Sequence, residues 1–94
     1  MEMSKVMECE ISECAYNMDN RCHTLAITIG DSMSPQCDTF CQSSAKGGNA
    51  SCNAGVGACK VSGCINNFNL ECSASGVTIG YKDQEADCLT FQIR

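Results

Sequence analysis

The chain has 94 residues, a formal net charge of −5 and ten cysteines. This length allows one ordinary domain or two very small ones, and the 16 residues that are Leu, Ile, Val or Phe are too few for an apolar core to stabilise a fold unaided. The six Lys and Arg residues are scattered along an acidic chain, which argues against nucleic-acid binding.

Short strands and turns follow one another along the sequence. Residues 16–22 (YNMDNRC) are turn-rich and leave room for one helical turn, and residues 25–29 alternate like a strand before Gly30. Thr39 and Phe40 predict a second short strand. Residues 66–72 (NNFNLEC) again predict turns, residues 77–81 a strand, and residues 88–93 (CLTFQI) another. The predicted fold class is therefore mostly β.

An internal repeat is the strongest signal. "CEISECAYNMDNRCHTLAITIG" from Cys9 aligns without a gap on "CKVSGCINNFNLECSASGVTIG" from Cys59, at a constant offset of 50. After one inserted residue, "CDTF" from Cys37 aligns on "CLTF" from Cys88. The chain is thus a tandem duplication, with a first four-cysteine module at 7–41 (copy one) and a second at 57–94 (copy two).

Residues 42–56 (QSSAKGGNASCNAGV) lie between the copies and have no hydrophobic period. Their richness in Ser, Gly, Ala and Asn predicts a flexible linker. The expected architecture is two small, metal-stapled modules of short strands and turns, joined by that linker.

The repeat also sorts the cysteines. Cys41 aligns on Gln92 and Cys52 lies in the linker, so neither has a counterpart in the other copy; we treat both as accessory thiols. Each copy keeps four equivalent cysteines, spaced C-x4-C-x7-C-x14-C in copy one and C-x4-C-x7-C-x15-C in copy two. These eight framework cysteines are Cys9, Cys14, Cys22, Cys37, Cys59, Cys64, Cys72 and Cys88.

The framework cysteines could hold metal or disulfides. The first ten residues, MEMSKVMECE, are acidic and lack the apolar segment of a secretory leader, so the expected compartment is the reducing cytoplasm. There, small cysteine-dense proteins are more often metal sites than disulfide scaffolds. A disulfide-stapled extracellular or coat protein is the alternative.

Four thiolates per copy are the number that a closed tetrahedral zinc site needs. The eight framework cysteines are therefore the predicted ligands of two zinc ions, one in each copy. Iron is the less favoured metal, because the cysteine run of ferredoxins is missing. Eight thiolates and two divalent ions would change the formal charge from −5 to −9. Copy one has fewer large apolar residues, so we expect it to lose structure first on chelation.

The cysteine pattern with its neighbours resembles a family of short bacterial proteins, domain of unknown function 1540, which often occurs in tandem. The resemblance covers both repeats. It implies a small cysteine-bound module and no particular activity. The matching positions are Cys9, Cys14, Tyr16, Asn17, Cys22, Cys37, Thr39 and Phe40 in copy one, and Cys59, Cys64, Asn67, Cys72, Ala74, Cys88, Thr90 and Phe91 in copy two.

Catalysis finds little support in the sequence. His23 is the only histidine, copy two has Ser73 at its position, and a closed four-sulfur site leaves no open coordination position. We therefore predict a non-catalytic binding or adaptor module that holds an unidentified protein partner, and no membrane segment. Metal buffering or sequestration is the other metal-based alternative.

Overall fold

The computed structural model describes residues 3–30, 35–43, 45–49, 51–82 and 85–94. Within these ranges the chain forms nine short strands and no helix. The strands are β1 (Lys5–Cys9), β2 (Asn17–Met18), β3 (Arg21–Cys22), β4 (Ala26–Ile29), β5 (Gly55–Cys59), β6 (Asn67–Phe68), β7 (Glu71–Cys72), β8 (Gly76–Lys82) and β9 (Glu85–Cys88). Nothing helical in the described part of the chain has the length and apolar character needed to cross a bilayer.

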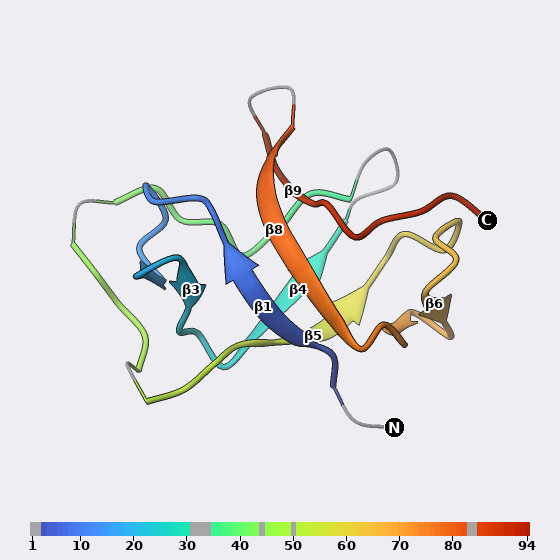
Figure 1. Cartoon of the computed structure of the whole chain (residues 1–94), viewed down its shortest axis with the longest axis horizontal. Helices are drawn as coiled ribbons and strands as arrows, with labels where there is room; N and C mark the ends of the chain where they lie inside the picture. The colour runs from blue at the N-terminus through green and yellow to red at the C-terminus, as the bar shows by residue number, and fades with distance from the viewer. Residues whose placement is uncertain (1–2, 31–34, 44, 50, 83–84) are drawn as a thin grey trace.

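Strands from both copies form one five-stranded sheet, in the order β4-β5-β1-β8-β9 (Figure 1). The strand that leads into copy one, β1, pairs in parallel with β8 of copy two. The strand that leads into copy two, β5, pairs in parallel with β4 of copy one. Each copy therefore completes its sheet with the first strand of the other copy.

The two exchanged pairings are equivalent residue by residue. Val6 pairs with Val77 in one, and Val56 with Ile27 in the other, and both pairings carry a register shift just after these residues. β1 and β5 meet antiparallel at the sheet centre through Lys5 and Gly55, which are 50 positions apart, like all equivalent residues of the repeat. The molecule thus has an internal pseudo-twofold axis between β1 and β5.

The expectation of two separate modules on a linker therefore needs correction. Val6, Ile27, Val56 and Val77 are each 2–3% exposed and belong to a single core cluster that includes both copies. One copy alone has too few large apolar side chains to form such a core, and sharing the sheet lets both sets pack together.

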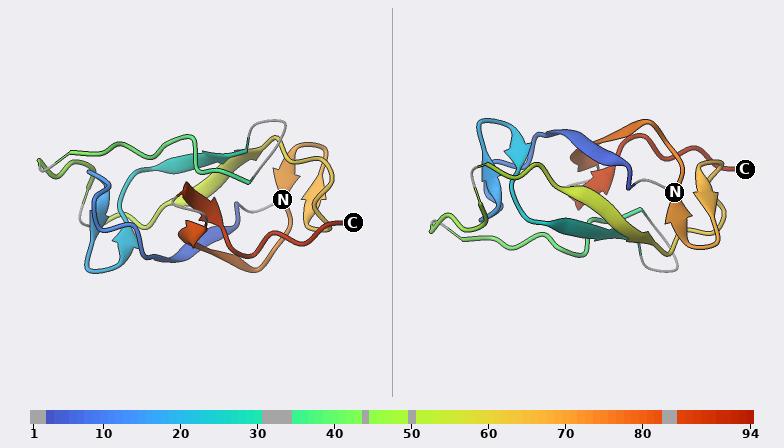
Figure 2. Two further views of the ribbon diagram at one scale, coloured as in Figure 1. Left: turned by 90° about the horizontal axis from the view of Figure 1, so that it is seen from above. Right: turned by 90° about the horizontal axis from the view of Figure 1, so that it is seen from below.

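A tight hairpin, β2–β3 or β6–β7, lies at each end of the flattened molecule, which measures 36 × 30 × 15 Å (Figure 2). Asp19 and Asn20 form the turn of the first hairpin with φ of 56° and 62°, and Asn69 and Leu70 form the second with φ of 53° and 64°. Two successive residues with positive φ are the conformation of a two-residue hairpin turn of type I′. The predicted turn regions are confirmed.

Leu70 is poorly suited to its turn, because a branched side chain in the left-handed region is strained. It is 54% exposed, and its counterpart in copy one is Asn20, a residue that tolerates this conformation. Leu70→Asn is therefore expected to raise the free energy of unfolding by roughly 0.5–1 kcal/mol. Urea denaturation measures the change. Asn20→Leu, the reverse exchange in copy one, should lower the free energy of unfolding, and a gain there would contradict this reasoning.

The predicted strands at 25–29 and 77–81 are present as β4 and β8, but the prediction of strands at Thr39–Phe40 and at 88–93 is wrong. Thr39 lies in a turn and accepts a hydrogen bond from the Thr28 amide (3.2 Å), and Thr90 accepts one from the Thr78 amide (3.0 Å). These threonines therefore fasten a turn to the side of β4 or β8. The last strand, β9, ends at Cys88, which is the first residue of the segment predicted to be a strand.

The linker is not the free segment that its composition predicts. Ala54 is fully buried, and Gly55 and Val56 belong to β5. Further back, the Gly47 amide donates to the Ala15 carbonyl (2.8 Å), and other amides bond carbonyls of Glu13, His23 and Cys22. Residues 44 and 50 lie outside the described ranges. Small polar residues favour a flexible coil only where their backbone amides find no hydrogen-bond acceptor. Here the carbonyls of copy one accept hydrogen bonds from those amides.

Gly48 marks the closest approach of the linker to copy one. Its φ is +84°, and a Cβ at this position would lie 2.6 Å from the His23 carbonyl oxygen. Gly48→Ala is expected to destabilise the fold by about 1–3 kcal/mol, because both the backbone conformation and the contact become strained. The midpoint of urea unfolding measures this effect. Gly63→Ala is the matched control, since a Cβ there meets nothing within 4 Å; equal losses in both variants would contradict the prediction.

Candidate metal centres

The first candidate centre is a small cavity of about 10 Å³ lined mainly by copy one. All four framework cysteines of that copy line it, and all four are buried. They reach it from different elements: β1 brings Cys9, β3 brings Cys22, and Cys14 and Cys37 lie at isolated β-bridges next to turns. Residues far apart in sequence are thus brought together as sulfur neighbours.

The second candidate centre repeats this arrangement. The framework cysteines of copy two line a cavity of about 20 Å³. Cavities of this size accommodate about one water-sized particle, which is the right scale for a single ion. All ten cysteines are free thiols. No group of three or more His, Cys, Asp or Glu side chains within the described ranges is already drawn together as a metal site, so metal binding by the quartets stays a prediction.

Backbone amides point at several of these sulfurs from two residues further along the chain. The Asn66 amide donates to Cys64 Sγ at 3.4 Å. The Thr24 amide donates to the Cys22 thiolate, and the Thr39 amide to that of Cys37. Amide donors stabilise the thiolate form, which is the form that binds metal.

Burial has the opposite effect. It raises the pKa of Cys37 to about 12 and that of Cys88 to about 11, against an ordinary value of 9.0. The negative charge of the other framework thiolates raises these pKa values further, whereas the amides of Thr39 and Thr90 lower them. Burial and like charge thus favour the protonated form of Cys37 and Cys88, and a bound cation would favour their thiolate form.

A family model of the Domain of Unknown Function (DUF1540) matches residues 7–43 and 58–91. The chain belongs to the DUF1540 family. Neither the curated proteins nor the solved structures include a match to it. The two matched segments confirm the tandem copies and contain all eight framework cysteines. The first residues of β5, Gly55–Gly57, lie outside the second match.

In this DUF1540 chain, a buried asparagine supports each quartet. Asn17 Nδ2 donates to the Cys9 carbonyl (2.7 Å), and Asn67 Nδ2 donates to the Cys59 carbonyl (2.9 Å). Each bond fixes the hairpin of a copy against the strand that carries its first cysteine. Both residues occupy equivalent repeat positions, a signal that could have identified this role from the sequence.

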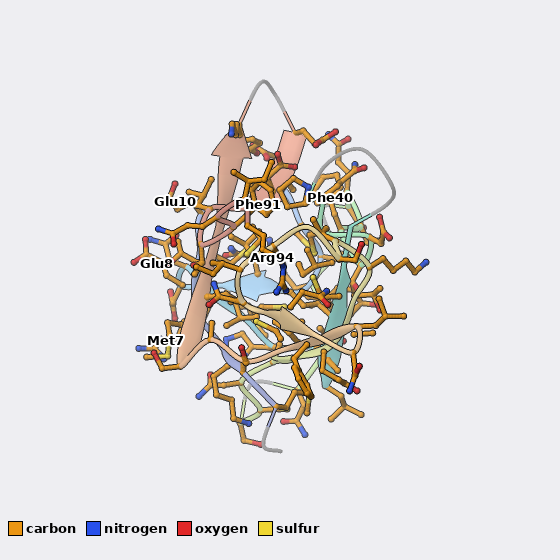
Figure 3. All side chains as sticks on the ribbon, turned by 90° about the vertical axis from the view of Figure 1, so that its right-hand side faces the viewer. Met7, Glu8, Glu10, Phe40, Phe91 and Arg94 are labelled. Atoms are coloured by element: carbon orange, nitrogen blue, oxygen red, sulfur yellow. The ribbon has the colours of Figure 1, made fainter. Side chains whose placement is uncertain are left out.

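A cation also lies beside the second framework cysteine of each DUF1540 copy. Lys46 Nζ donates to the carbonyls of Ser12 (3.0 Å) and Cys14 (3.2 Å). Arg94 donates to the Cys64 carbonyl (2.9 Å), and Figure 3 shows it in the middle of the copy-two end. Lys46 lies in the linker and Arg94 is the last residue of the chain. The alignment of the two copies therefore does not pair them, although each bonds the carbonyl of a second framework cysteine.

The remaining candidates lie outside both quartets. His23 lines neither cavity; its Nδ1 contacts the Cys52 carbonyl (2.8 Å) and its Nε2 the Met18 carbonyl (3.3 Å). Cys41 is exposed, and Cys52 is half-buried.

The two DUF1540 copies line each other's cavities. Ile79 of copy two lines the copy-one cavity, and Ile29 of copy one lines the copy-two cavity. Ala86 and Pro35 make a second reciprocal pair. Both isoleucines are 2% exposed. Each candidate centre is therefore complete only when both copies are folded.

Proposed function

We propose that this protein binds two zinc ions, one in each copy, and that each ion is held by the four framework cysteines of its copy. The observation that carries this proposal is the convergence of each quartet on one small cavity, at equivalent positions of a repeated sequence. Four thiolates close a tetrahedral zinc site at bond lengths of about 2.3 Å, and drawing the sulfurs together around the ion would complete it.

The surroundings of the quartets support zinc bound as a dianionic four-thiolate centre. Amide donors to sulfur, and a cation bonded to the Cys14 or Cys64 carbonyl, both offset negative charge at the site. Iron is the less favoured alternative, since four thiolates suit it as well. A closed site of this kind is structural, so the proposal is a non-catalytic module.

A binding or adaptor role fits the surface of copy two. Apolar side chains on its hairpin and nearby segments are more than half exposed, where copy one has smaller or polar residues at the same repeat positions. A contiguous patch of such side chains would be typical of a surface that holds a protein partner. They are Ile65, Phe68, Leu70 and Ile93.

Native mass spectrometry of the reduced chain titrated with zinc tests the proposal. Two tightly bound equivalents are expected, and Cys14→Ser or Cys64→Ser should leave one at most. The double variant Cys41→Ser/Cys52→Ser is the matched control and should still bind two. Failure to bind zinc would contradict the proposal. Uptake of more than two equivalents that disappears in the control would favour metal storage instead, and eight framework thiols oxidised in the native protein would favour the disulfide alternative.

A further inference from the structure

A surface pocket of about 440 Å³ lies at the copy-one end of the molecule, outside both quartets. Three segments that are far apart in sequence line it: residues 5–7 of β1, Arg21 of β3, and residues 51–53 of the linker. None of the framework cysteines lines it, so the proposed zinc centres give it no role. Its volume falls in the range of sites that take small molecules.

Backbone hydrogen bonds hold the three walls of this pocket together. The Val6 amide donates to the Ala54 carbonyl (2.9 Å), and the Ala54 amide donates to the Cys22 carbonyl (3.0 Å). The linker is thus fixed between β1 and β3 immediately after the residues that line the pocket. Lys5 pairs with a glycine of β5 and a glycine of β8, so neither paired residue has a side chain to cover it.

The charge of the pocket is opposite to that of the chain. Two of its lining residues, Lys5 and Arg21, are cations, and none of the described lining residues is a carboxylate. Glu8 belongs to the same strand but does not line the pocket, and Figure 3 shows it further along that side of the molecule than Met7. On a chain of net charge −5, the pocket is a local site of positive potential.

The equivalent positions of copy two carry no such pair of cations. Gly55 aligns on Lys5, and Glu71 aligns on Arg21. Arg21 and Glu71 are both exposed and both belong to the second strand of a hairpin. Because the hairpin of copy two forms with a glutamate at this position, the fold itself does not require the cations of copy one. The charge of the pocket is therefore a property of its surface rather than of the fold.

Two cations that face one opening suit a dianionic phosphate better than a single carboxylate. The planar guanidinium of Arg21 can bond two phosphate oxygens, and Lys5 supplies a second positive charge. The side-chain amide of Asn53, which also lines the pocket, is a further donor. Met7 lines the same pocket and is 58% exposed, so it offers an apolar surface next to the charges.

We propose that this pocket binds a small organic phosphate, a phosphomonoester whose phosphate group is held by Lys5 and Arg21 and whose organic part packs on Met7. The site uses no framework cysteine, so it goes beyond the proposed metal binding and does not depend on it. Since both cations are exposed, binding should weaken as the salt concentration rises.

The test titrates the folded full chain, as purified under reducing conditions, with phenyl phosphate and with inorganic phosphate, and follows amide NMR signals. We expect saturable shifts at residues 5–7, 21 and 51–53. Phenyl phosphate should bind roughly threefold more tightly than inorganic phosphate, because its ring covers Met7, and Met7→Ala should remove that difference. Equal affinities in the unaltered chain would overturn the assignment of an organic ligand.

The phosphate contacts are tested by charge. Arg21→Glu gives copy one the residue of copy two and should weaken phenyl phosphate binding roughly tenfold. Lys82→Glu is the matched control, because it changes the net charge equally at an exposed position outside the pocket. The exchange Arg21→Glu/Glu71→Arg keeps the net charge and should weaken binding as much as Arg21→Glu alone. Equal weakening by Arg21→Glu and Lys82→Glu, or recovery of binding in the exchange variant, would overturn the proposal.

Discussion

Removing zinc from the loaded chain is expected to unfold both copies in a single transition. A structural zinc site contributes an apparent ~10–16 kcal/mol to a small domain, which is more than the apolar core of this chain can replace. β1 pairs with β8, and β5 pairs with β4, so the loss of either copy strips a partner strand from the other. The shared sheet therefore replaces the expectation, drawn from composition alone, that copy one loses structure first.

Stepwise chelation followed by residue-resolved NMR measures this coupling. Amide signals of β4 and β8, one strand from each copy, should decline together as zinc is withdrawn. The Cys41→Ser/Cys52→Ser variant is the control, because it keeps both quartets and removes the accessory thiols. Persistence of native β8 signals after those of β4 have gone would show independent modules.

The second large effect is expected from the isoleucines that cross between copies. Ile79→Ala should cost about 2–5 kcal/mol of stability, because it leaves a cavity in a core position that is 2% exposed. Since Ile79 lines the copy-one cavity, the variant should weaken zinc binding at copy one more than at copy two. Ile29→Ala should do the reverse, because Ile29 lines the cavity of copy two.

Competition titrations against a zinc chelator measure the two affinities. Cys64→Ser or Cys14→Ser, added to each isoleucine variant, leaves a single quartet to be measured. Ile93→Ala is the matched control, because that side chain is 80% exposed and should cost little. An Ile79→Ala variant that weakens only the copy-two centre would rule out the exchanged arrangement.

Local features of the fold could be read from the sequence because they depend on neighbouring residues. The Asp-Asn pair at 19–20 favours a left-handed turn wherever it occurs, and the alternation before Gly30 specifies a strand with one buried face. Leu70 shows the limit of that reasoning, since it adopts the same turn against its own preference. At position 70, the alignment with Asn20 predicts the turn conformation better than the residue type does.

The misplaced strands have a common cause. Thr39 and Phe40 have strand-forming side chains, but a β-strand needs a partner, and the hydrogen bond from Thr28 to the Thr39 hydroxyl holds this segment in a turn. Gly55 and Val56, by contrast, were assigned to a linker and form part of a strand, because β1 and β4 offer them free edges. Strand propensity does not say which edges will be available.

Spacing and local conformational preference were enough to predict the duplication, the eight framework cysteines, the two turn regions and the strands β4 and β8. Tertiary packing decides three further features: the copies exchange their first strands, Ile29 and Ile79 line the opposite cavities, and the linker bonds to the Cys22 and His23 carbonyls. The physical reason is that a period of two tells which face of a strand is buried but not which strand will lie beside it. Strand order depends on the total apolar surface that the fold buries. In this chain, only the two copies together bury enough apolar surface to stabilise the fold.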